Sequence, residues 1–220
     1  MKIGTDGVLL SAWASLKHNP NSILDIGSGT GIIALMLAQR SYAGLIDALE
    51  IDEDAYEQSS ENFENSEWSD RLFCYHASFD EFVKEMQDEE YDLIISNPPF
   101  YAEDHFSENS QRNQARFQKA LPFGELLDGV AKLLSKNGKF NVIIPLIEEQ
   151  NFLEIAEANN LYPSRITRVK GNPEVPPKRT LLELGFQKGH FEPEFLTIET
   201  SRHHYTPEYI ALTKDFYLKM

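Results

Sequence analysis

The stretch Asp25-Ile26-Gly27-Ser28-Gly29-Thr30-Gly31 decides the fold class, because it joins a short apolar run to an apolar helix pattern. Residues 22–26 are expected to form a buried strand and residues 32–39 a helix. Glycines in such a turn remove side chains, so that the backbone can approach a ligand. In an open α/β sheet, ligands bind at this place, outside the carboxyl ends of the strands. The stretch therefore predicts an α/β fold with a ligand site at its first turn.

The sequence on both sides of this turn alternates between strand and helix patterns. Strands are expected at residues 22–26, 45–50, 72–75, 91–96 and 139–144, and a pair that could form a hairpin at 164–170 and 180–187. Helices are expected at residues 5–16, 32–39, 54–64, 80–87, 123–134, 148–158 and 207–218. Thr5 or Asp6 could cap the first helix, and Gly138 is expected to separate the fifth helix from its strand. The alternation predicts a mostly parallel sheet with helices on both faces.

Length and composition restrict the classes of protein that remain. The chain has 220 residues, which favours one domain over residues 1–220. Its formal net charge of −15 argues against a protein that binds nucleic acid over its whole surface, but not against a local basic face. Cys74 is the only cysteine, which excludes internal disulfides and favours a reducing compartment. Since no apolar run is long enough to cross a bilayer, we expect a cytoplasmic protein without membrane contact.

The glycine turn does not fit the two common phosphate-binding patterns. Ile32 stands where the dinucleotide fingerprint needs its third glycine, and no lysine follows as in the phosphate-binding loop of nucleotide hydrolases. Glu50, at the end of the second strand, is placed to accept hydrogen bonds from two ribose hydroxyls. A ribose without phosphates, held beside a cationic group, describes S-adenosylmethionine (SAM). A tight structural turn is the alternative for the glycines, and an ordinary surface side chain for Glu50.

The fourth strand ends in Asn97-Pro98-Pro99-Phe100, the most informative tetrad of the chain. Two prolines remove two backbone donors and force the chain into extended geometry, so the Pro98 carbonyl lies beyond the sheet. That carbonyl and the Asn97 side-chain oxygen can each accept one N–H of a planar amino group. Phe100 can stack on the ring that carries the amine. The tetrad therefore predicts catalysis at an amine or amide nitrogen, with a rigid turn as the alternative.

These motifs resemble the class I SAM-dependent methyltransferases, in the branch that methylates nitrogens through an N-P-P-[FY] loop. Three segments resemble more closely the bacterial tRNA1(Val) adenine-N6 methyltransferase family: residues 1–14, the tetrad, and the tail at residues 205–219. The glycine turn marks only the superfamily. The resemblance implies a Rossmann-like fold with a seven-stranded, mostly parallel sheet, a C-terminal antiparallel hairpin and helices on both faces.

The resemblance also implies roles for individual residues. Asn97, Pro98, Pro99 and Phe100 resemble the group that holds the amine. The cofactor-binding residues by resemblance are Gly4, Thr5, Asp6, Asp25, Gly27, Gly29, Glu50, Ser78 and Asn97. Within this set, the segment of Gly4, Thr5 and Asp6 is expected to close over the methionine end of SAM, and Ser78 to lie at its adenine, where the family commonly has an acid.

An RNA surface on an acidic protein requires locally concentrated positive charge. Two clusters are candidates: Arg112, Arg116 and Lys119 after the tetrad, and Arg165, Arg168, Lys170, Lys178 and Arg179 in the predicted hairpin. Solvated loops are the alternative for both. His203-His204 could suggest a metal pair, but adjacent side chains diverge, so we expect no metal.

The hypothesis from the sequence is a monomeric, cytoplasmic SAM-dependent enzyme that methylates N6 of an adenine in tRNA. By resemblance, this is the anticodon-loop adenine of a valine tRNA. One alternative is methylation of a glutamine amide in a translation factor or of a guanine amine in ribosomal RNA. Another is a SAM-binding partner subunit without catalysis.

Overall fold

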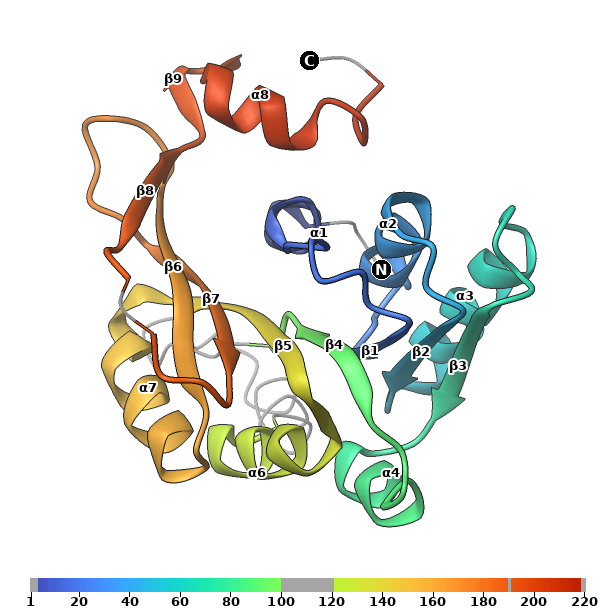
Figure 1. The fold of residues 1–220 in the computed structure, drawn as a ribbon. Coiled ribbons are helices and arrows are strands. Elements are labelled where there is room, and N and C mark those ends of the chain that lie inside the picture. Colours follow the sequence, from blue (N-terminus) through green and yellow to red (C-terminus); the bar gives the residue numbers. More distant parts are fainter. Residues whose placement is uncertain (1–3, 100–120, 190, 219–220) are drawn as a thin grey trace, which may run out of the picture.

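A computed structural model describes residues 4–99, 121–189 and 191–218 of the chain. Eight strands form one mixed sheet in the order β3-β2-β1-β4-β5-β7-β6-β8 (Figure 1). The strands of this sheet are Ser22–Ile26 (β1), Leu45–Glu50 (β2), Leu72–His76 (β3), Tyr91–Ser96 (β4), Leu134–Pro145 (β5), Tyr162–Lys170 (β6), Arg179–Gly185 (β7) and Glu194–Thr197 (β8). The helices are Thr5–Trp13 (α1), Ile32–Arg40 (α2), Glu53–Glu64 (α3), Phe79–Glu85 (α4), Phe123–Leu133 (α6), Leu146–Glu148 (η2), Glu149–Ala158 (α7) and Pro207–Thr213 (α8). A separate two-stranded sheet joins Glu199–Ser201 (β9) to His204–Tyr205 (β10).

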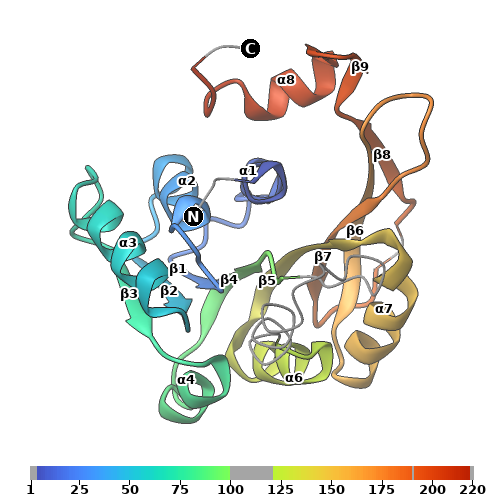
Figure 2. The same cartoon turned by 180° about the vertical axis from the view of Figure 1, so that it is seen from behind.

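The central strands are buried on both faces because most of their residues are apolar. Along β1, Ile23 belongs to the core beneath α1 and α2, whereas Leu24 belongs to the core beneath α6 and α7. Successive strand residues point to opposite faces, so an apolar run serves two cores. Helices α1, α2 and α3 cover one face, and α4, α6 and α7 cover the other (Figures 1 and 2). The predicted α/β class with helices on both faces is confirmed.

The predicted hairpin is present and is part of the main sheet. Strand β7 runs antiparallel to both β5 and β6, while β1 to β5 pair in parallel. The sheet has eight strands rather than the seven expected, because β8 adds in parallel to the outer edge of β6. The sequence signal for β8 is weak, since this strand is only four residues long and has two exposed residues.

Gly138 does not separate helix from strand as the sequence predicted. Strand β5 begins at Leu134, directly after α6, and Gly138 lies inside it. The pairing with β4 jumps from Leu134 opposite Tyr91 to Lys139 opposite Leu93, so the residues between form a bulge. A bulge accommodates extra residues in one strand without breaking the sheet, which explains how a glycine is accepted there.

The first and last helices are shorter than expected. Helix α1 ends at Trp13 instead of residue 16, and α8 ends at Thr213 instead of residue 218. Gly4 is the N-cap of α1, so neither Thr5 nor Asp6 caps it as predicted. At α8 the Thr206 side chain accepts from the Tyr209 backbone N–H at 3.2 Å, as the Thr-Pro start predicted. Within the described ranges, no helix is long and apolar enough to span a membrane.

Candidate active site

The glycine turn between β1 and α2 adopts a conformation that favours glycine. Gly27, Gly29 and Gly31 have φ angles of 75°, 58° and 76°, in the left-handed region. A Cβ on Gly31 would lie 2.5 Å from a ring carbon of Phe63, so close packing also requires glycine there. A Cβ on Gly27 would meet no heavy atom within 4 Å. The turn thus has a packed side against α3 and an open side at Gly27.

Glu50 ends β2 beside this turn and anchors it. Its Oε2 accepts from the Gly29 backbone N–H at 2.8 Å, and its Oε1 accepts from the backbone N–H groups of Ile51 and Asp52, both at 2.9 Å. A carboxylate offers about four acceptor positions. The three N–H donors therefore leave about one position for a ligand hydroxyl. The side chain was expected to receive two hydroxyls, and its additional role in holding the glycine turn was not anticipated.

Asp25 lies at the carboxyl end of β1 with its side chain completely buried. Neither carboxylate oxygen meets a hydrogen-bond partner of normal geometry among the described residues. Burial raises the pKa of Asp25 to about 7; the nearby Ala34 backbone N–H lowers this pKa and the Glu50 charge raises it. An unsatisfied buried carboxyl group is costly, and its position at the ligand turn makes it a candidate partner for a cationic ligand.

The tetrad begins immediately beside the glycine turn, because β4 is the neighbour of β1 in the sheet. Ser96 lies opposite Ile26, and the Ser96 hydroxyl donates to the Ile26 carbonyl at 2.8 Å. Asn97 and Pro98 therefore lie at the same sheet edge as Gly27. A Cβ on Gly7 of α1 would lie 3.7 Å from Asn97 Nδ2, so α1 closely approaches the tetrad. Phe100 lies outside the described residues.

Ser78, the residue predicted at the adenine of SAM, is the N-cap of α4. Its hydroxyl accepts from the Glu81 backbone N–H at 3.4 Å, and its own backbone N–H donates to Glu81 Oε2 at 3.2 Å, forming a capping box at α4. Sequence reasoning missed Ile51, which follows Glu50 and is 48% exposed. The signal was an apolar residue between two acids at a strand end. Ile51 offers the exposed apolar surface that a flat base requires.

The predicted RNA-binding residues of the hairpin do not form one basic face. Arg165 lies over the Trp13 ring of α1 at 4.4 Å, whereas Arg168 pairs with Glu149 of α7 on the opposite side of the sheet. Residues three apart on a strand point to opposite faces. Arg179 lies on the α1 side, where its Nε contacts Asp6 Oδ2 at 3.0 Å.

All three arginines of the hairpin already have acidic partners. Arg165 pairs with Glu194 at 3.2 Å, and Arg168 with Glu149 at 2.6 Å. Lys170 lies 6.0 Å from the Phe195 ring, and Lys178 is exposed on the turn between β6 and β7. The lysines therefore offer more available charge than the arginines. The second predicted cluster, Arg112, Arg116 and Lys119, lies outside the described residues.

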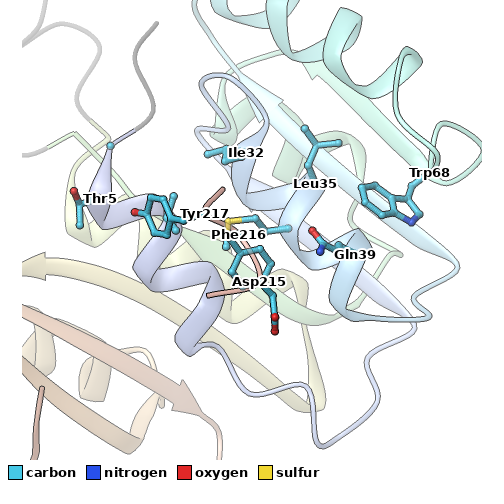
Figure 3. A pocket seen from close by; sticks show the side chains of 11 residues that line it. Thr5, Ile32, Leu35, Gln39, Trp68, Asp215, Phe216 and Tyr217 are labelled. Carbon is cyan, nitrogen blue, oxygen red and sulfur yellow. The ribbon is translucent and has the colours of Figure 1, made fainter. Parts of the chain in front are cut away.

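A pocket of about 520 Å³ lies elsewhere, between the outer sides of α1 and α2 and the C-terminal segment (Figure 3). Apolar side chains such as Val8, Met36 and Phe216 line it, together with Thr5 and Gln39. Neither Asp25 nor Asn97 lines this pocket. It adjoins the predicted cofactor segment only through Gly4 and Thr5. In the described part of the chain, no group of three or more His, Cys, Asp or Glu side chains could hold a metal ion.

The comparisons with known proteins agree with this geometry. The family described as "Methyltransferase small domain" matches residues 4–145. The tRNA1(Val) (adenine(37)-N6)-methyltransferase of Christiangramia forsetii is 65% identical over all of this chain and 92% of its own length. The protein of the same name from Flavobacterium psychrophilum is 62% identical over all of this chain and 94% of its own length.

Two solved structures show the same fold at low sequence identity. A predicted O-methyltransferase from Agrobacterium tumefaciens superposes with a TM-score of 0.68 at 17% identity and covers 96% of each chain. A ribosomal protein L11 methylase from Lactobacillus delbrueckii superposes with a TM-score of 0.57 at 15% identity, over 84% of this chain and 77% of that one. The full-length identities decide the family: the chain belongs to the bacterial tRNA1(Val) adenine-N6 methyltransferase family of class I SAM-dependent methyltransferases.

Proposed function

We propose that this protein transfers a methyl group from SAM to the exocyclic N6 of an adenine in tRNA. By its likeness to the relatives named above, the target is adenine 37 of tRNA1(Val). The observation that carries the proposal is the adjacency of the glycine turn and the Asn97-Pro98 loop at the ends of the paired strands β1 and β4. This adjacency would bring a methyl donor and a methyl acceptor to one sheet edge.

The residues of the turn fit SAM. The buried Asp25 carboxylate, whose oxygens have no hydrogen bond of normal geometry, would attract a cationic ligand, and Gly27 leaves open space beside the backbone. Glu50 keeps about one acceptor position for a ribose hydroxyl, and Ile51 exposes apolar surface for the adenine. When bound, SAM supplies an electrophilic methyl group on a positively charged sulfur. These four residues would bind and orient it.

Asn97 and Pro98 would act on the target amine. The Asn97 side-chain oxygen and the Pro98 carbonyl would each accept one N–H, which favours a pyramidal nitrogen with its lone pair directed toward the methyl group. The same two acceptors would stabilise positive charge as it develops on this nitrogen. The methylated nitrogen loses its proton readily, so this step requires no strong base.

The substrate adenine must leave its neighbours to reach this edge, which favours an unpaired loop as target. Within the hairpin, Lys170 and Lys178 would be the cations that meet phosphates, since the hairpin arginines hold acidic partners. Stacking by Phe100 stays a prediction from the sequence. The proposal takes residues 1–220 as one methyltransferase domain that works as a monomer in the cytoplasm.

The experiment that tests this function incubates the protein with labelled SAM and separate pools of unmodified tRNA, ribosomal RNA and protein. We expect label in tRNA, and nucleoside mass spectrometry should identify it as N6-methyladenosine. Label in the protein pool alone would indicate an amide substrate, and label in ribosomal RNA a guanine amine. SAM binding without transfer to any pool would leave a non-catalytic partner role.

A further inference from the structure

Helix α1 is attached at both ends to the β6–β7 hairpin, although about 150 residues or more separate them in the sequence. At its C-terminal end, the Trp13 indole N–H donates to the Thr167 hydroxyl at 2.9 Å, and Arg165 donates to the Trp13 carbonyl at 3.2 Å. At its N-terminal end, Arg179 Nε donates to Asp6 Oδ2 at 3.0 Å. The hairpin thus helps to hold α1 in place, together with α2, whose Arg40 donates to the Ser11 and Ala14 carbonyls.

The N-terminal attachment acts on the part of α1 nearest the candidate active site. Asp6 precedes Gly7, the residue whose Cα faces Asn97 Nδ2 and the α2 side chain Ile33. Gly4, the N-cap, accepts the Val8 backbone N–H at 3.5 Å. A displacement of Asp6 would therefore move both the segment next to the tetrad and the start of the helix.

Arg179 comes from a rigid part of the hairpin. It is the first residue of β7 and lies opposite Pro145 of β5 and Val169 of β6. The preceding carbonyl, of Lys178, accepts from the Leu146 backbone N–H at 3.0 Å. The Arg179 and Asp6 side chains are 39% and 38% exposed, so water screens their attraction only in part. The guanidinium is a fixed support for Asp6, built into the sheet.

We propose that Arg179 is a positioning residue for the cofactor: through its ion pair with Asp6 it holds the Gly4–Gly7 segment in place over the SAM-binding edge. This inference rests on the proposed function and on the adjacency of Gly7 to Asn97, which brings that segment to the edge where SAM would bind. It assigns Arg179 a role in SAM binding that does not require RNA. The sequence alone had placed Arg179 among the RNA contacts.

The test measures the dissociation constant of SAM by calorimetry, without RNA, for wild type, Arg179→Gln, Asp6→Asn and the double variant. We expect each single variant to bind SAM about two- to fivefold more weakly, the range of partly exposed ion pairs. The double variant should bind no more weakly than the weaker single variant, because both remove one interaction. Arg179→Lys should recover part of the loss.

The matched control is Lys132→Gln, which removes the exposed Lys132–Asp128 pair at 2.6 Å, far from the sheet edge, and should leave SAM binding unchanged. The inference is overturned if Arg179→Gln binds SAM like wild type while its KM for tRNA rises, because Arg179 would then be an RNA contact only. Additive losses in the double variant would also overturn it. Failure of the wild-type protein to bind SAM would instead refute the proposed function.

Discussion

The buried carboxyl group of Asp25 gives a prediction with a calculable size. Its pKa is raised from 3.8 to about 7 in the folded protein, chiefly because burial disfavours the charged form. A raised acid pKa stabilises the folded state fully below the unfolded pKa, and this contribution is lost as the pH rises through about 7. At about 1.4 kcal/mol per pKa unit, the whole loss is about 4 kcal/mol, of which about 2.5 kcal/mol falls between pH 5 and 8.

The perturbation is Asp25→Asn, which keeps the shape of the side chain and removes its titration. Urea unfolding of both proteins at pH 5, 6, 7 and 8 gives the free energy of unfolding at each pH. We expect the wild type to lose about 2.5 kcal/mol more than the variant over this range. Asp47, whose pKa burial also raises, titrates in both proteins and cancels in the difference. A difference between the proteins that does not change with pH would refute the reasoning.

The same group links SAM binding to pH. A cationic ligand beside Asp25 would favour the carboxylate and lower its pKa, so binding would release a proton. We therefore expect wild-type affinity for SAM to increase with pH up to about 7, by at most about tenfold per pH unit. Asp25→Asn should abolish this dependence. Calorimetry in buffers of different ionisation enthalpy counts the protons released, and equal release by wild type and variant would exclude Asp25 as the source.

Three further substitutions test other parts of the site. Asn97→Ala should raise the activation free energy of methyl transfer by about 2–4 kcal/mol, and so lower kcat, while SAM affinity stays nearly unchanged. Single-turnover assays with unmodified tRNA would measure the rate, and near-normal turnover would contradict the amine-holding role. Glu50→Gln replaces one carboxylate oxygen by an NH2 group, which would face a backbone N–H donor. We expect the free energy of unfolding to fall by about 1–3 kcal/mol and SAM binding to weaken, as urea unfolding and calorimetry would measure. Gly31→Ala should lower the midpoint temperature of thermal unfolding, because the φ of 76° at Gly31 and its contact with Phe63 both disfavour a Cβ. An unchanged midpoint would contradict this reasoning.

The parts of the fold that the sequence predicted are those with local causes. The glycines at positions 27, 29 and 31 have left-handed φ angles, and the prolines after Asn97 end a strand. Each of these effects depends on residues adjacent in the chain. The parallel arrangement of the strands was predictable because strands and helices alternate along the chain, and parallel strands need helical crossover connections. The position of the candidate site, at the carboxyl ends of β1 and β4, could therefore be predicted from the sequence.

The interactions that the sequence did not predict join residues far apart in the chain. Asp6 and Arg179 are separated by 173 positions, and both carry charges that would equally suit a solvent-exposed surface. Glu50 was assigned to a ligand, but its backbone partners at Gly29 and Asp52 depend on how the two strand ends meet. The sequence could have predicted that the hairpin arginines lie on different faces of the sheet. Arg165 and Arg168 are three positions apart on one strand, and this spacing alone places them on opposite faces.

The distribution of charge over the sheet explains how an acidic protein can accept RNA. Helix α3 is strongly acidic and packs by β2 and β3, at the opposite end of the sheet from the β6–β7 hairpin (Figure 1). Six strand spacings separate β3 from β6, about 29 Å at about 4.8 Å per spacing. This is more than three times the screening length of about 8 Å at physiological ionic strength. The acidic end therefore exerts little repulsion at the hairpin, where Arg165, Arg168 and Arg179 pair with acidic neighbours. We propose that the hairpin lysines, Lys170 and Lys178, meet the phosphates there. The net charge of −15 thus describes the chain as a whole and does not describe the surface that we expect the tRNA to meet.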